Sequence, residues 1–191
     1  RGYESFGMLC SGTELGLNED LYPGAGYNGL LVLPEDARVG ADVKPILGMD
    51  DWIFDIAITA NRPDCQSIFG LAREVAAALG QPLKTPALDY TETEVEKEGF
   101  EVTVDAQDLC PRYIAHYVYD VKLGQSPAWM RRRLALVGNN SISNIVDITN
   151  YIMRELGQPL HAFDCNFLEG NAIQVRRANE GEKIVTLDEK E

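Results

Sequence analysis

The sequence predicts an α+β fold in two parts, a small α/β segment followed by helices packed on an antiparallel sheet. Two stretches, 52–59 and 100–104, alternate between apolar and polar side chains, which is the period of a strand. Two others, 67–79 and 143–157, repeat apolar residues every three or four positions, which is the period of one helix face. The acidic stretch 89–99 separates the parts, and such runs are typically solvated and extended.

Length, charge and composition narrow the possible functions. The chain has 191 residues, 45% of them hydrophobic, and no apolar run long enough to span a bilayer, so we expect a cytoplasmic protein with no membrane partner. The formal charge of −13 argues against broad, sequence-independent binding to phosphates, which depends on lysines and arginines. The four cysteines form no CxxC pair and only two histidines are present, so we predict no metal site.

The first 48 residues are short apolar runs broken by glycine and proline, which predicts turns and one buried strand near 29–34. The aromatic side chains of this region could form a stacking platform for bases. Few basic residues lie beside them, which favours packing in a core. These aromatic residues are Tyr3, Phe6, Tyr22 and Tyr27.

The strand predicted at 52–59 is followed by a turn at 61–64 and by the helix at 67–79. Asp64 or Ser67 can cap this helix, and a glycine after its last apolar residue ends it. Arg62 and Asp64 could belong to a site. An ion pair that locks the turn is the favoured interpretation.

The second part is predicted to begin with strands at 100–104 and 113–121, the latter apolar on both faces and therefore covered on both sides. Ser126 and Pro127 predict the N-cap and first residue of a helix. Arg131–Arg133 could grip a phosphate, but three adjacent helical residues spread over about 200° at 3.6 residues per turn. We therefore expect these arginines to form a solvated face.

The stretch 143–165 organises the second part. Asn144 is the predicted N-cap of its helix, and Asp147 meets the positive end of the helix dipole. A glycine and then Pro159 end the helix, and His161 follows in a turn with apolar neighbours, which suits a small ligand. A histidine near apolar residues is also commonly structural, and the spacing alone leaves both interpretations open.

The end of the chain is predicted to form strands at 172–177 and 184–187, joined by a turn at 179–182. The last strand would lack its next partner, so we expect the sheet to be incomplete. We expect the chain to be an internal piece of a longer polypeptide.

Several motifs resemble, in order, those of one family. The motifs VDITNY (146–151) and ELGQPLHAFD (155–164) are similar to a signature of the β chain of bacterial phenylalanyl-tRNA synthetase (phenylalanine–tRNA ligase). NRPDC (61–65) and GLAREVA (70–76) resemble another block of the same family. Shorter matches at 7–11, 110–113 and 175–178 extend the resemblance over nearly the whole chain.

The resemblance implies four regions and a function. Residues 1–48 would be the tail of an inserted OB-like, tRNA-binding-type region, 49–88 a strand–helix scaffold segment, 89–99 an acidic linker, and 100–191 the amino-terminal half of the B3/B4-type editing domain. The chain would then be part of a β subunit that serves ATP-dependent attachment of phenylalanine to its tRNA and hydrolysis of mischarged tyrosyl-tRNA. A non-catalytic scaffold or partner-binding module of the same subunit is the alternative, and a free-standing hydrolase is disfavoured.

The resemblance also implies site residues and partners. Thr149, Asn150 and Pro159 would bind the aminoacyl group, and His161 would bind or orient the ester or the attacking water as the editing residue. The partners would be the catalytic α chain and phenylalanine tRNA, with ATP and Mg used by the holoenzyme and no cofactor in this piece. The family's basic residue before the signature is replaced by Asn140, and its acidic residue that reads the tyrosine hydroxyl lies outside this sequence. We therefore expect the isolated piece to be inactive.

Overall fold

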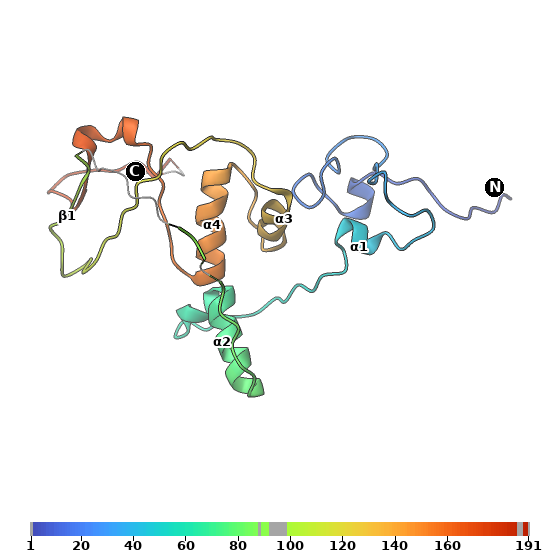
Figure 1. Cartoon of the computed structure of the whole chain (residues 1–191), viewed down its shortest axis with the longest axis horizontal. Coiled ribbons are helices and arrows are strands. Elements are labelled where there is room, and N and C mark those ends of the chain that lie inside the picture. Colours follow the sequence, from blue (N-terminus) through green and yellow to red (C-terminus); the bar gives the residue numbers. More distant parts are fainter. Residues whose placement is uncertain (1, 88, 92–98, 187–188, 191) are drawn as a thin grey trace. The chain divides into compact units, whose positions relative to one another are not determined.

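The computed structural model describes residues 2–87, 89–91, 99–186 and 189–190. The chain divides into two compact units. Figure 1 labels helices α1 to α4 and strand β1. Unit 1 is formed by Arg1–Thr85 with Lys122–Ala162, and unit 2 by Pro86–Val121 with Phe163–Glu191. Helices and a small sheet occur together, as an α+β class requires, whereas the four predicted regions stay predictions.

Unit 1 begins with a small apolar core. A 3-10 turn, η1 (Thr13–Leu15), and the one-turn helix α1 (Lys44–Leu47) frame this core. Its buried residues are Leu17, Ala25 and Leu47, with Leu15, Leu21, Tyr22, Leu31, Leu33 and Val43 packed against them. Core packing is therefore confirmed for Tyr22, but it is wrong for Tyr3, Phe6 and Tyr27, which are all highly exposed.

Two strands predicted in unit 1 do not form. Residues 29–34 and 52–59 form no strand in the structure, although Leu31 N donates to Cys10 O at 2.9 Å. Trp52 and Phe54, expected on the inner face of a sheet, are 83% and 78% exposed. A strand must pair its backbone N–H and C=O groups with a neighbour, and alternation of side chains does not supply that neighbour.

The helix α2 (Ile68–Leu79) follows the 3-10 turn η2 (Pro63–Gln66) and agrees with the prediction. Ser67 is its N-cap, since Oγ accepts from Gly70 N at 3.0 Å. Gly80 ends the helix in the left-handed conformation, with φ of 62°. Ser67 rather than Asp64 is therefore the cap.

Helices α3 (Ala128–Leu136) and α4 (Asn144–Leu156) complete unit 1 and also confirm the predicted helices, with shifted caps. Ser143 caps α4, one residue before the predicted Asn144, and its Oγ accepts from Val146 N. Pro127 takes the N-cap position of α3 that was predicted for Ser126. Each shift frees a polar side chain for a contact outside its own helix.

Unit 2 contains a two-stranded sheet of β1 (Glu101–Val104) and β2 (Ala172–Val175), with the short 3-10 turns η3 (Cys165–Phe167) and η4 (Glu169–Asn171) before β2. The strands run parallel, with Glu101 opposite Ala172. The predicted antiparallel sheet is therefore wrong for these strands. A parallel pair needs a long crossover rather than a tight hairpin, and the chain between β1 and β2 supplies one.

The other strands predicted for unit 2 are not formed where the structure describes them. Residues 113–121 are irregular and mostly exposed, and 184–186 have no strand pairing. Leu187, the end of the predicted last strand, and most of the acidic stretch, 92–98, lie outside the described residues. Among the described helices, none is long and apolar enough to cross a membrane.

Candidate functional site

The four predicted site residues lie on α4 and on the segment that follows it. Thr149 and Asn150 are half-buried in the middle of α4. The Thr149 hydroxyl donates to Val146 O at 2.7 Å, so its oxygen keeps lone pairs that can accept from a ligand. Pro159 and His161 lie beyond the helix end and are exposed. Thr149 and Asn150 precede the C-terminal end of α4, and Pro159 and His161 follow it. The placement of α4 therefore determines where both pairs lie.

The start of α4 is held by the carboxylate of Asp147, which is fully buried. Its Oδ2 accepts from Ser126 Oγ and from Ser141 Oγ, each at 2.5 Å, and its Oδ1 accepts from Ile142 N at 2.9 Å. Burial by itself raises the pKa of Asp147, but these hydrogen bonds outweigh burial and lower the pKa below its usual value. The carboxylate is therefore held in its charged form.

A second set of contacts at the same helix end involves Asn144. Its Nδ2 donates to Lys122 O at 2.8 Å, and its Oδ1 accepts from Gly124 N at 3.3 Å. The Asn144 backbone N–H donates to Gly124 O at 2.9 Å. Asn144, the residue predicted to cap its own helix, instead ties α4 to the segment that leads into α3.

Helix α3 packs on α4 through aromatic and cationic side chains. The rings of Trp129 and Tyr151 meet edge to face, with centroids 5.5 Å apart and an interplanar angle of 89°. The Arg133 guanidinium lies 5.5 Å from the Trp129 ring centroid and donates to Tyr151 Oη at 2.7 Å. Tyr151 in turn donates to Glu155 at 3.3 Å. These contacts occupy Arg133, which is therefore no free phosphate-binding group.

Arg131 contradicts the predicted solvated arginine face, because it is buried. Its Nη1 lies 3.6 Å from Asp20 Oδ1 and donates to Glu19 O at 3.4 Å. Its Nε has no hydrogen-bond partner among the described residues. Asp20 also accepts from Ser141 N at 3.4 Å. A buried charge needs a paired partner, so the position of Arg131 reflects the acidic segment near residue 20, which helix periodicity does not reveal.

The predicted apolar-walled turn around His161 is open in the structure. Leu160 and Phe163 are 43% and 53% exposed. A cleft of about 450 Å³ lies instead beside α1 and α3. The residues that line it are Pro45, Gly48, Asp50, Asp51, Trp129, Arg132, Arg133 and Leu136, so none of the four predicted site residues belongs to it. The site residues therefore stay predictions.

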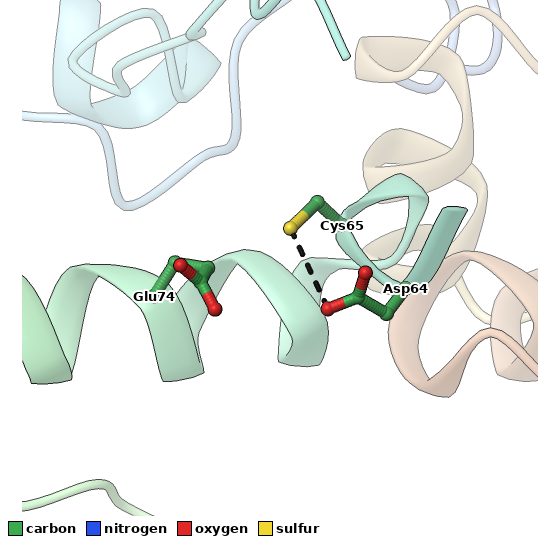
Figure 2. A group of neighbouring side chains, drawn as sticks. All are labelled: Asp64, Cys65 and Glu74. Carbon is green, nitrogen blue, oxygen red and sulfur yellow. Dashed lines mark hydrogen bonds between the residues drawn. The ribbon is translucent and has the colours of Figure 1, made fainter. Parts of the chain in front are cut away.

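Asp64, Cys65 and Glu74 bring their potential metal-ligating atoms within 4.8 Å of one another (Figure 2). Arg62 already pairs with both carboxylates, at 2.8 Å to Asp64 and 2.5 Å to Glu74. These hydrogen bonds lower the pKa of Asp64 to about 2, whereas burial raises the pKa of Cys65. A guanidinium that neutralises the acids, beside a protonated thiol, is a poor cation site. The predicted ion pair that locks this turn is confirmed.

Comparison with known proteins shows which family model and which relatives the chain resembles. Residues 109–191 match the family model described as "B3/4 domain". The chain is 51% identical over 195 residues to "Phenylalanine--tRNA ligase beta subunit" of Syntrophus aciditrophicus (strain SB). This alignment covers 100% of the chain and 23% of that relative. The resemblance to the ligase beta subunit is thereby confirmed.

Two further beta subunits of phenylalanine–tRNA ligase give similar values. Those of Moorella thermoacetica and Bdellovibrio bacteriovorus are each 50% identical over 189 residues, or 98% of the chain. The alignments cover 24% and 22% of these relatives. The chain thus spans about a quarter of the length of the beta subunits it matches.

The structure brings together two motifs that the ligase resemblance rests on. Ser67, between the NRPDC and GLAREVA motifs, lies against Gly157 in the ELGQPLHAFD motif. Sequence reasoning missed the role of Asp147 in the VDITNY motif, because it assigned this carboxylate to the dipole of its own helix. Ser126 and Ser141, which donate to it, lie 21 and 6 residues away. Ser126 lies beside the start of α3, but no local pattern pairs it with Asp147.

Proposed function

We propose that this chain is a segment of a phenylalanine–tRNA ligase beta subunit that contributes part of a site for hydrolysing mischarged tyrosyl-tRNA. Its similarity along the whole chain to beta subunits supports the general role. The observation that carries the editing proposal is the position of Thr149, Asn150, Pro159 and His161 at one helix and its exit, within a signature that resembles the editing domain. In the complete enzyme the α chain, phenylalanine tRNA, ATP and Mg would serve the synthetic reaction in the cytoplasm.

The chemistry of the substrates explains why such a site is needed. Tyrosine differs from phenylalanine by one hydroxyl group. A hydrophobic pocket rejects an isostere with an added hydroxyl by only about a hundredfold. A second site that selects the hydroxylated product can remove the errors, because it acts after the first selection has been made.

The proposed reaction is hydrolysis of an ester. A water molecule attacks the carbonyl carbon of the tyrosyl ester, and the bond between that carbon and the ribose oxygen breaks. Tyrosine leaves as its carboxylate. One proton of the water goes to the ribose oxygen, and the other is released to solvent. Pro159 would contact the aryl ring, Thr149 and Asn150 would offer polar atoms to the aminoacyl group, and His161 would bind or orient the ester or the water.

A non-catalytic role for the same residues is the second candidate. The exposure of Pro159 and His161 and the placement of the described cleft beside α1 and α3 favour it. In that case the segment would serve as a scaffold or partner-binding module of the beta subunit. The two candidates differ in whether changing one side chain near the helix exit affects hydrolysis.

The deciding experiment replaces His161 by alanine in the complete two-chain ligase. Loss of one positioned polar contact to the reacting ester costs about 2–4 kcal/mol, by analogy with removal of an oxyanion donor, which is a rate loss of roughly 30- to 1,000-fold. Accumulated tyrosyl-tRNA is measured beside phenylalanine-dependent ATP–pyrophosphate exchange. His116→Ala is the matched control, because His116 is the other histidine and is also exposed. Normal hydrolysis by His161→Ala would support the scaffold role instead.

A further inference from the structure

We infer that Asp147 is a positioning residue for the proposed hydrolysis, because it fixes the start and the rotation of the helix that carries Thr149 and Asn150. The inference rests on the proposed function and deepens it. Asp147 itself touches no proposed substrate position, and its side chain is fully buried. It acts through α4.

The contacts of Asp147 join three separate pieces of backbone. Ser126 lies just before α3, Ser141 and Ile142 lie in the loop between α3 and α4, and Asp147 is in the first turn of α4. Both carboxylate oxygens are used, one by two hydroxyls and one by a backbone N–H. Hydrogen bonds to an ionised group are short and about twice as strong as neutral ones. Asp147 therefore holds the entry of α4 from several directions.

The geometry of a helix carries this constraint to the predicted site. Asn150 is three residues after Asp147, so the two side chains share one face of α4. Thr149 directly precedes Asn150 in the same helix. A small rotation or shift of the first turn moves both. A misplacement of 1 Å at a reacting centre can lower a rate by about a hundredfold, so an anchor of the helix can affect hydrolysis without contacting substrate.

Two substitutions of Asp147 differ in how many of these hydrogen bonds they keep. Asp147→Asn keeps the shape and can still exchange hydrogen bonds with the two serines, because hydroxyls also accept. Its amide cannot accept from both serines and from Ile142 N as the carboxylate does. Asp147→Ala removes every one of these bonds. Positioning therefore predicts partial rescue by asparagine relative to alanine.

The test measures hydrolysis of tyrosyl-tRNA by the complete ligase carrying Asp147→Asn, Asn150→Ala and the double change. We expect Asp147→Asn to lower kcat with little change in KM, because it misorients bound substrate. In the double variant the loss should be smaller than the product of the single losses, because both changes act through one helix. Asp55→Asn, which removes an exposed carboxylate, is the control and should leave hydrolysis and phenylalanine-dependent exchange unchanged.

Two results would overturn the role of Asp147. One is a normal hydrolysis rate for Asp147→Asn while His161→Ala is impaired, which would leave the proposed function intact. The other is a double variant whose loss equals the product of the single losses, which is the signature of a general structural effect. If Asp147→Asn does not accumulate as folded enzyme, Ser126→Ala and Ser141→Ala take its place in the double-mutant comparison with Asn150→Ala. Both of these variants keep the charge of Asp147. Normal hydrolysis by His161→Ala identifies failure of the proposed function itself.

Discussion

Gly157, which ends α4, lies directly against Ser67, which caps α2. A Cβ added to Gly157 would be 3.2 Å from Ser67 Cβ, and Gly157 adopts a left-handed conformation with φ of 81°. The C-terminal end of one helix thus meets the N-terminal end of another. The exit of α4, from which Pro159 and His161 follow, is therefore set by the cap of α2.

This contact predicts the effect of Gly157→Ala. A residue other than glycine in the left-handed region costs about 1–2 kcal/mol, and here the new methyl group also meets Ser67. Gly80→Ala is the matched control, since Gly80 has φ of +62° at the end of α2 and nothing within 4 Å of an added Cβ. We expect Gly157→Ala to lower the free energy of unfolding more than Gly80→Ala, measured by chemical denaturation. Equal losses in the free energy of unfolding would show that Ser67 moves aside without lowering stability.

The lowered pKa of Asp147 predicts a pH dependence of stability. A carboxyl whose folded pKa lies below its unfolded value, about 3.9, stabilises the protein above that value. This stabilisation is lost as the pH falls through the folded pKa. We expect Asp147→Asn to cost about 2 kcal/mol near neutral pH, as for hydrogen bonds to charged groups, and less at pH 3, which lies below the unfolded pKa. Denaturation at both pH values checks this, with Asp55→Asn as the charge control, and a pH-independent difference would contradict it.

Two substitutions of Thr149 separate the effect of its volume from the effect of its hydroxyl group. Thr149→Val keeps the volume and removes the oxygen, and we expect hydrolysis of tyrosyl-tRNA by the complete ligase to fall about tenfold, the value of one hydrogen bond. Thr149→Leu should lower it further by filling the site. Thr59→Val, at an exposed threonine, is the control. If valine hydrolyses normally and leucine does not, Thr149 supplies space rather than a polar contact.

Charge predicts weak binding of tRNA to the isolated chain. The net charge is −13, and the arginine run of α3 is largely engaged, since Arg131 is buried and Arg133 bonds Tyr151. We expect a dissociation constant above roughly 10⁻⁵ M at physiological salt, the range of non-specific binding. Fluorescence anisotropy with labelled tRNA measures it. Nanomolar binding would show that the chain presents a docking surface which its charge does not suggest.

The helices were predictable from the sequence, and the strands were largely not. Apolar spacing and the flanking glycines identify α2 and α4, because helix hydrogen bonds are local and depend on nearby residues. A strand depends on a partner elsewhere, so 52–59 and 113–121 alternate correctly but remain unpaired in the structure. The parallel pairing of β1 with β2 joins residues about seventy positions apart, beyond the reach of a local pattern.

The candidate site was likewise predictable only where it depends on neighbouring residues in the sequence. Its residues were identified through motifs, and their places on α4 and beyond Gly157 follow from helix signals. The partners that hold α4 were not foreseen, because Ser126 and Asp147, or Arg131 and Asp20, are distant in sequence. A polar residue beside a helix start has several roles open to it, and only the folded chain shows which one it takes.

The division into two units has a practical consequence for anyone who cuts this chain. The polypeptide passes between the units after Thr85, after Val121 and after Ala162. Each unit is therefore built from two separate stretches, and no single truncation releases either one whole. A gene encoding unit 1 alone would have to omit both 86–121 and 163–191, and bridge the first gap with a linker. A protease that nicks the chain once between residues 86 and 162 would interrupt the backbone of both units, whose pieces would then be held together by non-covalent contacts.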